Sequence, residues 1–89
     1  MSVRITYDQA KRNRTLHERG LDFADAATVF AGVTISVEDT RRDYGEERII
    51  TAGHLMGRCV ALVWTPRDGA RRIISMRHVH ADEEQAWFG

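Results

Sequence analysis

The start of the chain combines a short alternating segment with a segment typical of a helix. Residues 3–7 alternate apolar and polar positions, which predicts a strand. Asp8 can accept hydrogen bonds from the unpaired backbone N–H groups of a first helical turn, and Gly20 can adopt the left-handed conformation that ends a helix. We therefore expect a helix from Gln9 to about Arg19.

A second helix is expected directly after the first. Asp22 is its expected N-cap, and the helix should end near Gly32. Four apolar residues between these points follow the spacing of one helical face, namely Phe23, Ala26, Ala27 and Phe30.

The period of the apolar positions changes from helical to alternating after this point. Four strands are predicted over residues 33–38, 47–53, 59–64 and 71–79. The third is apolar on both faces, so we expect it at the centre of a sheet. Turns are expected at residues 40–45, 56–57 and 65–69, and a short helix at 82–88.

This order of elements predicts the α+β class. A short N-terminal strand and two helices precede a four-stranded antiparallel meander, and a short helix follows it. The length of 89 residues fits one domain, residues 1–89. A domain of this size buries only about 60% of the surface that its unfolded chain exposes, so a partner chain or oligomerisation would help to stabilise it.

Composition favours a globular protein away from membranes. Apolar residues make up 43% of the chain and charged residues 29%, which is not the composition of a disordered protein. No apolar run approaches the roughly 18 residues of a membrane span. No apolar signal segment follows Met1, so we expect a cytoplasmic protein.

The net charge of zero conceals a segregation of charge along the chain. Residues 1–20 hold five basic and two acidic residues (+3), residues 21–47 two and seven (−5), and residues 48–89 six and four (+2). Twelve of the 13 basic residues are arginine. The basic ends can form a face that attracts polyanions, and the arginine fork matches phosphate oxygens. Arginine richness that merely reflects genomic base composition remains the alternative.

Metal and nucleophilic chemistry find little support in the sequence. His78 and His80 would point the same way on a strand, but two histidines alone do not make a metal site. Cys59 lies within an apolar segment, where a cysteine is typically a small core residue. The chain has neither a nucleophile elbow nor a glycine-rich phosphate loop. We therefore assign no metal and no cofactor from the sequence.

Arginines near the ends of the predicted strands are the remaining candidates for chemistry. Four of them lie on or directly beside three of these strands, namely Arg48, Arg58, Arg72 and Arg77. If strand ends converge, such a cluster would stabilise the extra negative charge of a phosphodiester-cleavage transition state. The nearby groups able to act as general acid or base are Glu46, Glu47, His54 and His78. Alternation along the last strand would put Arg72 and Arg77 on opposite faces. Arginines that are simply solvated or salt-bridged are the alternative.

Several segments together resemble the BrnT family of type II toxin–antitoxin toxins. The most specific are Gly-Leu-Asp-Phe-Ala-Asp-Ala at residues 20–26 and Ile-Ile-Ser-Met-Arg at residues 73–77. Further matches are Tyr-Asp-Gln-Ala-Lys-Arg at residues 7–12 and Asp-Tyr-Gly-Glu at residues 43–46. The resemblance covers nearly the whole chain.

The resemblance implies a RelE-like fold and an endoribonuclease that arrests translation and growth. It also implies a BrnA-type antitoxin with a ribbon-helix-helix part, through which alone the toxin would reach operator DNA. A homodimer or a heterotetramer with the antitoxin is expected. The candidate catalytic residues are Arg58, Arg77, Arg72 and Glu46, and the candidate RNA-binding residues are Arg48, His78 and Lys11. We expect the cleavage to be metal-independent.

The chain departs from the family pattern at the end of its first predicted helix. Glu18 and Arg19 occupy positions where the family often has Lys and His. His78 follows the last matching arginine, where a basic residue is usual. An alternative function is therefore a catalytically weak or inactive module that binds the antitoxin and acts in autoregulation of the operon.

Overall fold

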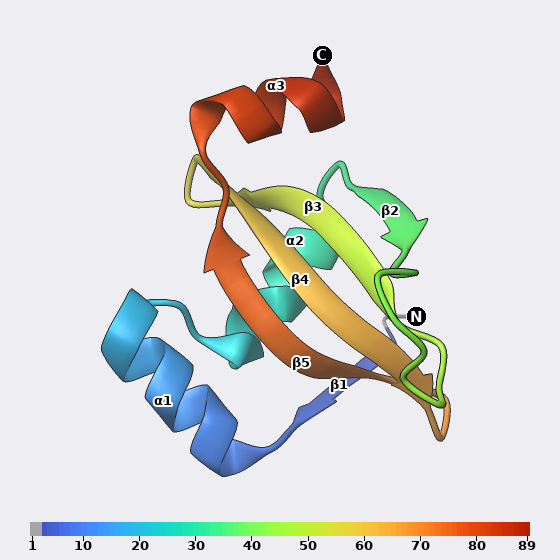
Figure 1. Ribbon diagram of the computed structural model, residues 1–89. Helices are drawn as coiled ribbons and strands as arrows, with labels where there is room; N and C mark the ends of the chain where they lie inside the picture. The colour runs from blue at the N-terminus through green and yellow to red at the C-terminus, as the bar shows by residue number, and fades with distance from the viewer. Residues whose placement is uncertain (1–2) are drawn as a thin grey trace.

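The computed structural model describes residues 3–89 as an α+β fold with one five-stranded mixed sheet (Figure 1). The elements in chain order are β1 (Arg4–Tyr7), α1 (Gln9–Arg19), the 3₁₀ turn η1 (Phe23–Asp25), α2 (Ala26–Ala31), β2 (Ile35–Glu38), β3 (Ile49–Leu55), β4 (Arg58–Arg67), β5 (Ala70–His78) and α3 (Ala81–Phe88). The strand order is β1-β5-β4-β3-β2. The α+β prediction is confirmed, and β4 lies at the centre as expected. Within the described residues, no helix is long and apolar enough to cross a membrane.

The sheet is the predicted antiparallel meander with one added parallel edge. β2 to β5 pair antiparallel in sequence order, whereas β1 pairs parallel with β5. The predicted turn over residues 65–69 is wrong in extent, because β4 continues through Pro66 to Arg67. The turn is only Asp68-Gly69, both with positive φ (53° and 75°). Two-residue turns with this backbone match the right-handed twist of the flanking strands.

The helix ends follow the predicted capping chemistry. The Asp8 carboxylate accepts a hydrogen bond from the Lys11 N–H (3.2 Å), and Gly20 ends α1 with φ 68°. The second helix differs from the prediction, because it starts as the 3₁₀ turn η1. A 3₁₀ turn has about three residues per turn, which shifts the buried stripe. Val29 is therefore fully buried, while Ala27 is exposed.

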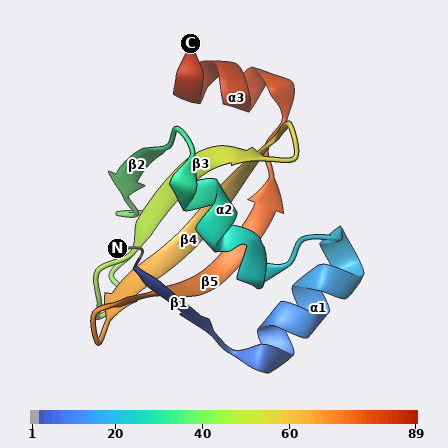
Figure 2. The same ribbon diagram turned by 180° about the vertical axis from the view of Figure 1, so that it is seen from behind.

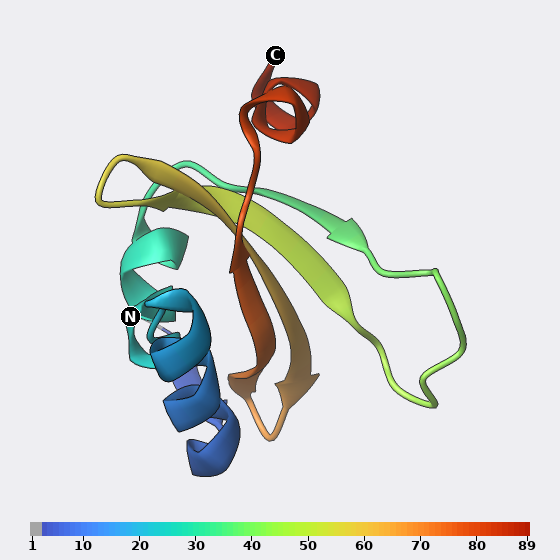
Figure 3. The ribbon, with the colours of Figure 1, turned by 60° about the vertical axis from the view of Figure 1, so that its left-hand side comes forward.

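One face of the sheet holds the core against η1 and α2, as Figures 1 and 2 show from opposite sides. Its fully buried large side chains include Phe23, Val29, Val60, Leu62, Ile73 and Met76. Seen nearly edge-on, α1 and α2 lie on one side of the sheet and leave the other side uncovered by them (Figure 3). We call this other side the open face. Alternation from the core residues assigns to it Ala52, His54, Cys59, Ala61, Arg72, Ser75 and Arg77.

A β-bulge in β5 decides which arginines share the open face. Val63 pairs with Ser75 but the next residue of β4, Trp64, pairs with Ile73, so Ile74 is an extra residue. The extra residue resets the alternation of the strand. The expectation that Arg72 and Arg77 lie on opposite faces is therefore wrong. Each directly neighbours in sequence a residue that faces the core, Ile73 or Met76, so both arginines point to the open face.

Candidate functional site

The three candidate catalytic arginines do not meet in one pocket. Arg58 begins β4, and Arg72 pairs with Thr65, seven residues further along the same strand. At about 3.3 Å per residue, this separates the two backbones by about 23 Å. Arg58 also points to the face opposite the open face, as its cross-strand partner Leu55 does. The expected convergence of strand-end arginines is therefore wrong.

Arg77 lies on the open face, where α3 approaches it. The two terminal nitrogens of Arg77 donate hydrogen bonds to the two carboxylate oxygens of Glu83 at 3.0 and 2.7 Å. Hydrogen bonding to Glu83 raises the pKa of Arg77, and the same contact lowers the pKa of Glu83. The guanidinium is therefore held by an internal carboxylate, with nearly half of its side chain exposed (47%).

Arg72 lies on the same face at the other end of β5. Its cross-strand neighbours are Thr6 of β1 and Thr65 of β4. Among residues 3–89, no carboxylate forms an ion pair with Arg72. The Thr65 hydroxyl donates to the carbonyl oxygen of Glu47 at 2.6 Å. This bond ties the loop between β2 and β3 to the Arg72 end of the open face.

That loop brings together two predicted residues, Glu46 and Arg48. The Glu46 carboxylate accepts hydrogen bonds from Arg48 and from Arg67, each at 3.3 Å. The Arg48 guanidinium also lies over the ring of Tyr44, 4.0 Å from its centroid. A cavity of about 330 Å³ is lined by Glu38, Asp39, Thr40, Arg42, Asp43, Tyr44, Glu46 and Arg48.

The loop is anchored by a buried carboxylate that the sequence analysis did not single out. Asp39 is 5% exposed and accepts two hydrogen bonds, each 2.8 Å long, from the Arg41 guanidinium. The Tyr44 hydroxyl donates to the same carboxylate at 3.1 Å. The Arg41 hydrogen bonds above all hold the pKa of Asp39 well below its usual value.

Lys11 lies in a second, separate groove between α1 and the free edge of β5. The groove has a volume of about 270 Å³ and is lined by Lys11, Arg14, Thr15, Glu18, Arg19, Ile74 and Ser75. The Arg19 guanidinium donates to the carbonyl oxygen of Met76 at 2.8 Å, which fixes α1 to this edge. Both substituted family positions, Glu18 and Arg19, therefore line the groove that holds Lys11.

His78 is set apart from the neighbouring Arg77. It pairs with Val60 and points to the core face. Its Nδ1 atom is buried, and no partner is found for it among the described residues. The imidazole can therefore reach a ligand only through its other nitrogen.

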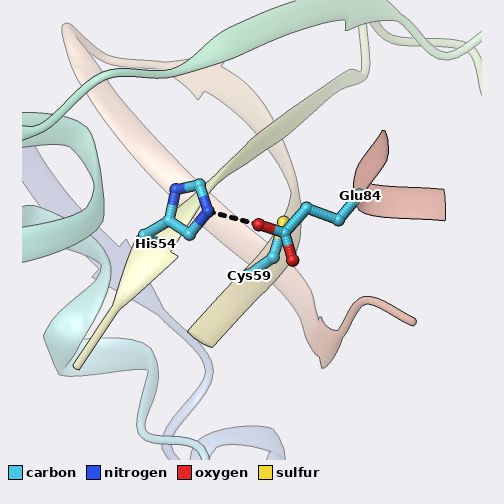
Figure 4. A group of neighbouring side chains, drawn as sticks. All are labelled: His54, Cys59 and Glu84. Atoms are coloured by element: carbon cyan, nitrogen blue, oxygen red, sulfur yellow. Dashed lines mark hydrogen bonds and ion pairs between the residues drawn. The ribbon is translucent and has the colours of Figure 1, made fainter. Parts of the chain in front are cut away.

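A third group of side chains joins the β3–β4 hairpin to α3. One ligand atom each from His54, Cys59 and Glu84 lies within 4.8 Å of the others (Figure 4). The sequence analysis assigned Cys59 to the core and did not single out Glu84. Spacing alone gives no signal for this group, because Glu84 is brought to the hairpin only by the docking of α3.

A comparison with protein families gives a match over most of the chain. The family model described as the ribonuclease toxin, BrnT, of type II toxin–antitoxin system matches residues 7–83, which is well over half of the chain. Among curated proteins, none matches the chain.

Proposed function

The chain belongs to the BrnT family of ribonuclease toxins of type II toxin–antitoxin systems, and from this we propose that it is an endoribonuclease that cleaves RNA and thereby inhibits translation. The observation that carries the proposal to particular residues is the shared face of Arg72 and Arg77. The two arginines pair with Thr65 and Ala61, four residues apart along β4, or about 13 Å. One RNA strand lying along the open face would contact both.

We propose cleavage by attack of the ribose 2′-oxygen on the adjacent phosphorus, without a metal ion. A base takes the 2′-hydroxyl proton, the 2′-oxygen–phosphorus bond forms, and the bond to the 5′-oxygen breaks as that oxygen takes a proton. Arg72 and Arg77 would stabilise the negative charge that grows on the phosphate oxygens. Glu46 is our candidate base, since the contact between Thr65 and Glu47 keeps it at the Arg72 end.

We propose that three further residues bind the RNA on either side of this centre. Arg48 borders the loop cavity beside Glu46. Lys11 extends the basic surface along the groove at the edge of β5. His78 would contribute through Nε2, because its Nδ1 atom is buried. Contacts with phosphates make binding depend on salt concentration.

Cleavage of RNA by the purified chain and its arginine variants tests the proposal. Arg72→Ala and Arg77→Ala should each lower the rate by roughly 10²–10³, the cost of one lost transition-state contact. Arg58→Ala tests the sequence-based assignment of that residue, which lies on the opposite face. The control is Arg71→Ala, an arginine on the face opposite the open face, where its guanidinium lies 4.0 Å from the centroid of the Phe30 ring. Absence of both cleavage and growth arrest on expression would rule the proposal out.

The family implies an antitoxin partner, and we propose that it is of the BrnA type. The partner would contribute a ribbon-helix-helix part that binds operator DNA, which the toxin would not touch directly. Co-expression and size-exclusion chromatography with light scattering test this, including whether a toxin homodimer or a heterotetramer forms. A chain that stays alone beside its co-expressed antitoxin contradicts the proposal.

One observation favours the second candidate, an antitoxin-binding module with little or no catalysis. The Arg77 guanidinium is already bound by Glu83 and is not free for a phosphate. This candidate predicts that expression leaves growth unaffected while the antitoxin still co-purifies. Growth arrest that depends on Arg72 would exclude it.

A further inference from the structure

Three side chains that differ in chemistry converge where α3 crosses the end of the open face. His54 and Cys59 are direct cross-strand neighbours in the β3–β4 hairpin, and Glu84 comes from the first turn of α3. Figure 4 shows the Glu84 carboxylate directed toward both the imidazole and the sulfur. The His54 Nε2 atom lies 2.9 Å from a Glu84 carboxylate oxygen. We propose that these three residues form a Zn²⁺ site that fastens α3 to the sheet.

The geometry suits a tetrahedral ion with three protein ligands. Bonds of about 2.0–2.3 Å from zinc to nitrogen, oxygen and sulfur require ligand atoms some 3–4 Å apart. The three atoms already lie within 4.8 Å of one another. Small side-chain rotations that replace the His54–Glu84 hydrogen bond by two metal bonds complete the arrangement. The fourth position is left for a solvent molecule.

The donor set selects zinc over the harder cations. A thiolate, an imidazole and a carboxylate are the ligands that zinc sites use, whereas Mg²⁺ and Ca²⁺ take oxygen ligands. The charges of one thiolate and one carboxylate balance the two charges of the ion. The positive charge of Arg77, which lies on the same face of the sheet, is offset by its ion pair with Glu83.

Cys59 is the buried member of the group, with only 4% of the residue exposed. A coordinating thiol loses its proton to solvent when Zn²⁺ binds. The ion can enter from the side of His54 and Glu84, whose side chains are 41% and 40% exposed.

The hairpin that carries His54 and Cys59 is held in place more firmly than the helix that carries Glu84. The Met56-Gly57 turn, with φ of 49° and 78°, closes the hairpin and fixes the register of His54 opposite Cys59. The ring of Phe88 packs against the His54 imidazole with their centroids 5.0 Å apart. α3 buries no side chain fully, so a metal bond from Glu84 would supply an anchor that packing does not.

Metal binding by the intact, metal-stripped chain tests the proposal without reference to RNA cleavage. We expect one Zn²⁺ per chain by calorimetry, and a sulfur-to-metal charge-transfer band when Co²⁺ is added instead. Loss of any one ligand, in His54→Gln, Cys59→Ser or Glu84→Gln, should weaken Zn²⁺ binding by at least tenfold. The matched controls His80→Gln and Asp82→Asn, which alter neighbouring residues outside the group, should bind as the unaltered chain does.

Two results would overturn the proposal. One is the absence of stoichiometric binding by the unaltered chain. The other is a Co²⁺ spectrum without the sulfur band, which would show that the ion is bound elsewhere. Both results come from the unaltered chain, so neither depends on whether a variant folds. Chelation should lower the melting temperature but leave RNA cleavage intact, so failure of the zinc site and failure of the proposed ribonuclease function give different results.

Discussion

Glu83 holds both terminal nitrogens of Arg77 through hydrogen bonds of 3.0 and 2.7 Å, so an α3 carboxylate occupies an open-face arginine. A phosphate oxygen that binds Arg77 must displace this carboxylate. The first turn of α3 is acidic, with Asp82, Glu83 and Glu84 in sequence. The C-terminal helix therefore competes with a polyanion for the open face.

Removing the charge of Glu83 should free Arg77 for RNA. An exposed ion pair is worth about 0.2–1 kcal/mol, so Glu83→Gln should raise kcat/KM for RNA cleavage by up to about fivefold. The measurement is cleavage under conditions where substrate is well below KM. Asp82→Asn removes a neighbouring charge that does not pair with Arg77 and should change the rate less. A lower rate in Glu83→Gln would mean that the ion pair positions Arg77 instead of masking it.

Truncation of Asp22 should loosen α1. The Asp22 carboxylate accepts hydrogen bonds from two Arg12 nitrogens (2.9 and 2.7 Å) and from the Ala24 N–H (2.9 Å). α1 fully buries none of its side chains, so it depends on such contacts. Loss of an N-cap usually costs about 0.5–2 kcal/mol, and Asp22→Ala should lower the free energy of unfolding by at least that much. Urea denaturation measures it.

The control for Asp22 is the next acidic residue along the chain. Asp25 precedes α2 without a side-chain capping bond. Asp25→Ala should therefore stay within about 0.5 kcal/mol of the unaltered chain, as most surface substitutions do. An equal loss in both variants would assign the effect to helix propensity and not to the Arg12 contact.

The sequence could predict what is decided locally. Asp8 and Gly20 set the bounds of α1 correctly, because capping depends on residues within one turn of each helix end. The insertion of Ile74 into β5 could not be predicted, since a bulge depends on the partner strand. That one residue reversed the expected relation of Arg72 and Arg77. The meeting of Glu84 with His54 likewise depends on the docking of α3.

The buried Asp39 carboxylate should make stability depend on pH. Its side chain is fully buried beside Arg41, whose hydrogen bonds hold the pKa of Asp39 well below the value near 3.8 that it takes in an unfolded chain. The folded state thus binds this proton less readily than the unfolded state. The contact stabilises the fold above about pH 4 and loses that contribution as the pH falls further.

Comparison of pH 7 with pH 3 checks this effect. The denaturation midpoint of the unaltered chain should fall more between these values than that of Asp39→Asn, which has no carboxyl group to protonate. Asp68→Asn, at an exposed turn that tolerates asparagine, should keep the full pH dependence. Equal slopes for Asp39→Asn and the unaltered chain would show that other carboxylates dominate acid unfolding.

Gly53 should tolerate no side chain, because β3 and α2 touch there. A Cβ atom added to Gly53 would lie 2.6 Å from the Cγ1 atom of Val29 and 3.1 Å from the Cγ2 atom of Thr34. Val29 is fully buried, so it cannot move aside freely. Gly53→Ala should cost about 1–3 kcal/mol of unfolding free energy, the usual cost of overpacking a core.

If the clash with Val29 is the cause, Val29→Ala should recover part of this loss when combined with Gly53→Ala. The two substitutions would then be less than additive, as expected for residues in contact. Strict additivity in a double-mutant cycle would contradict this explanation.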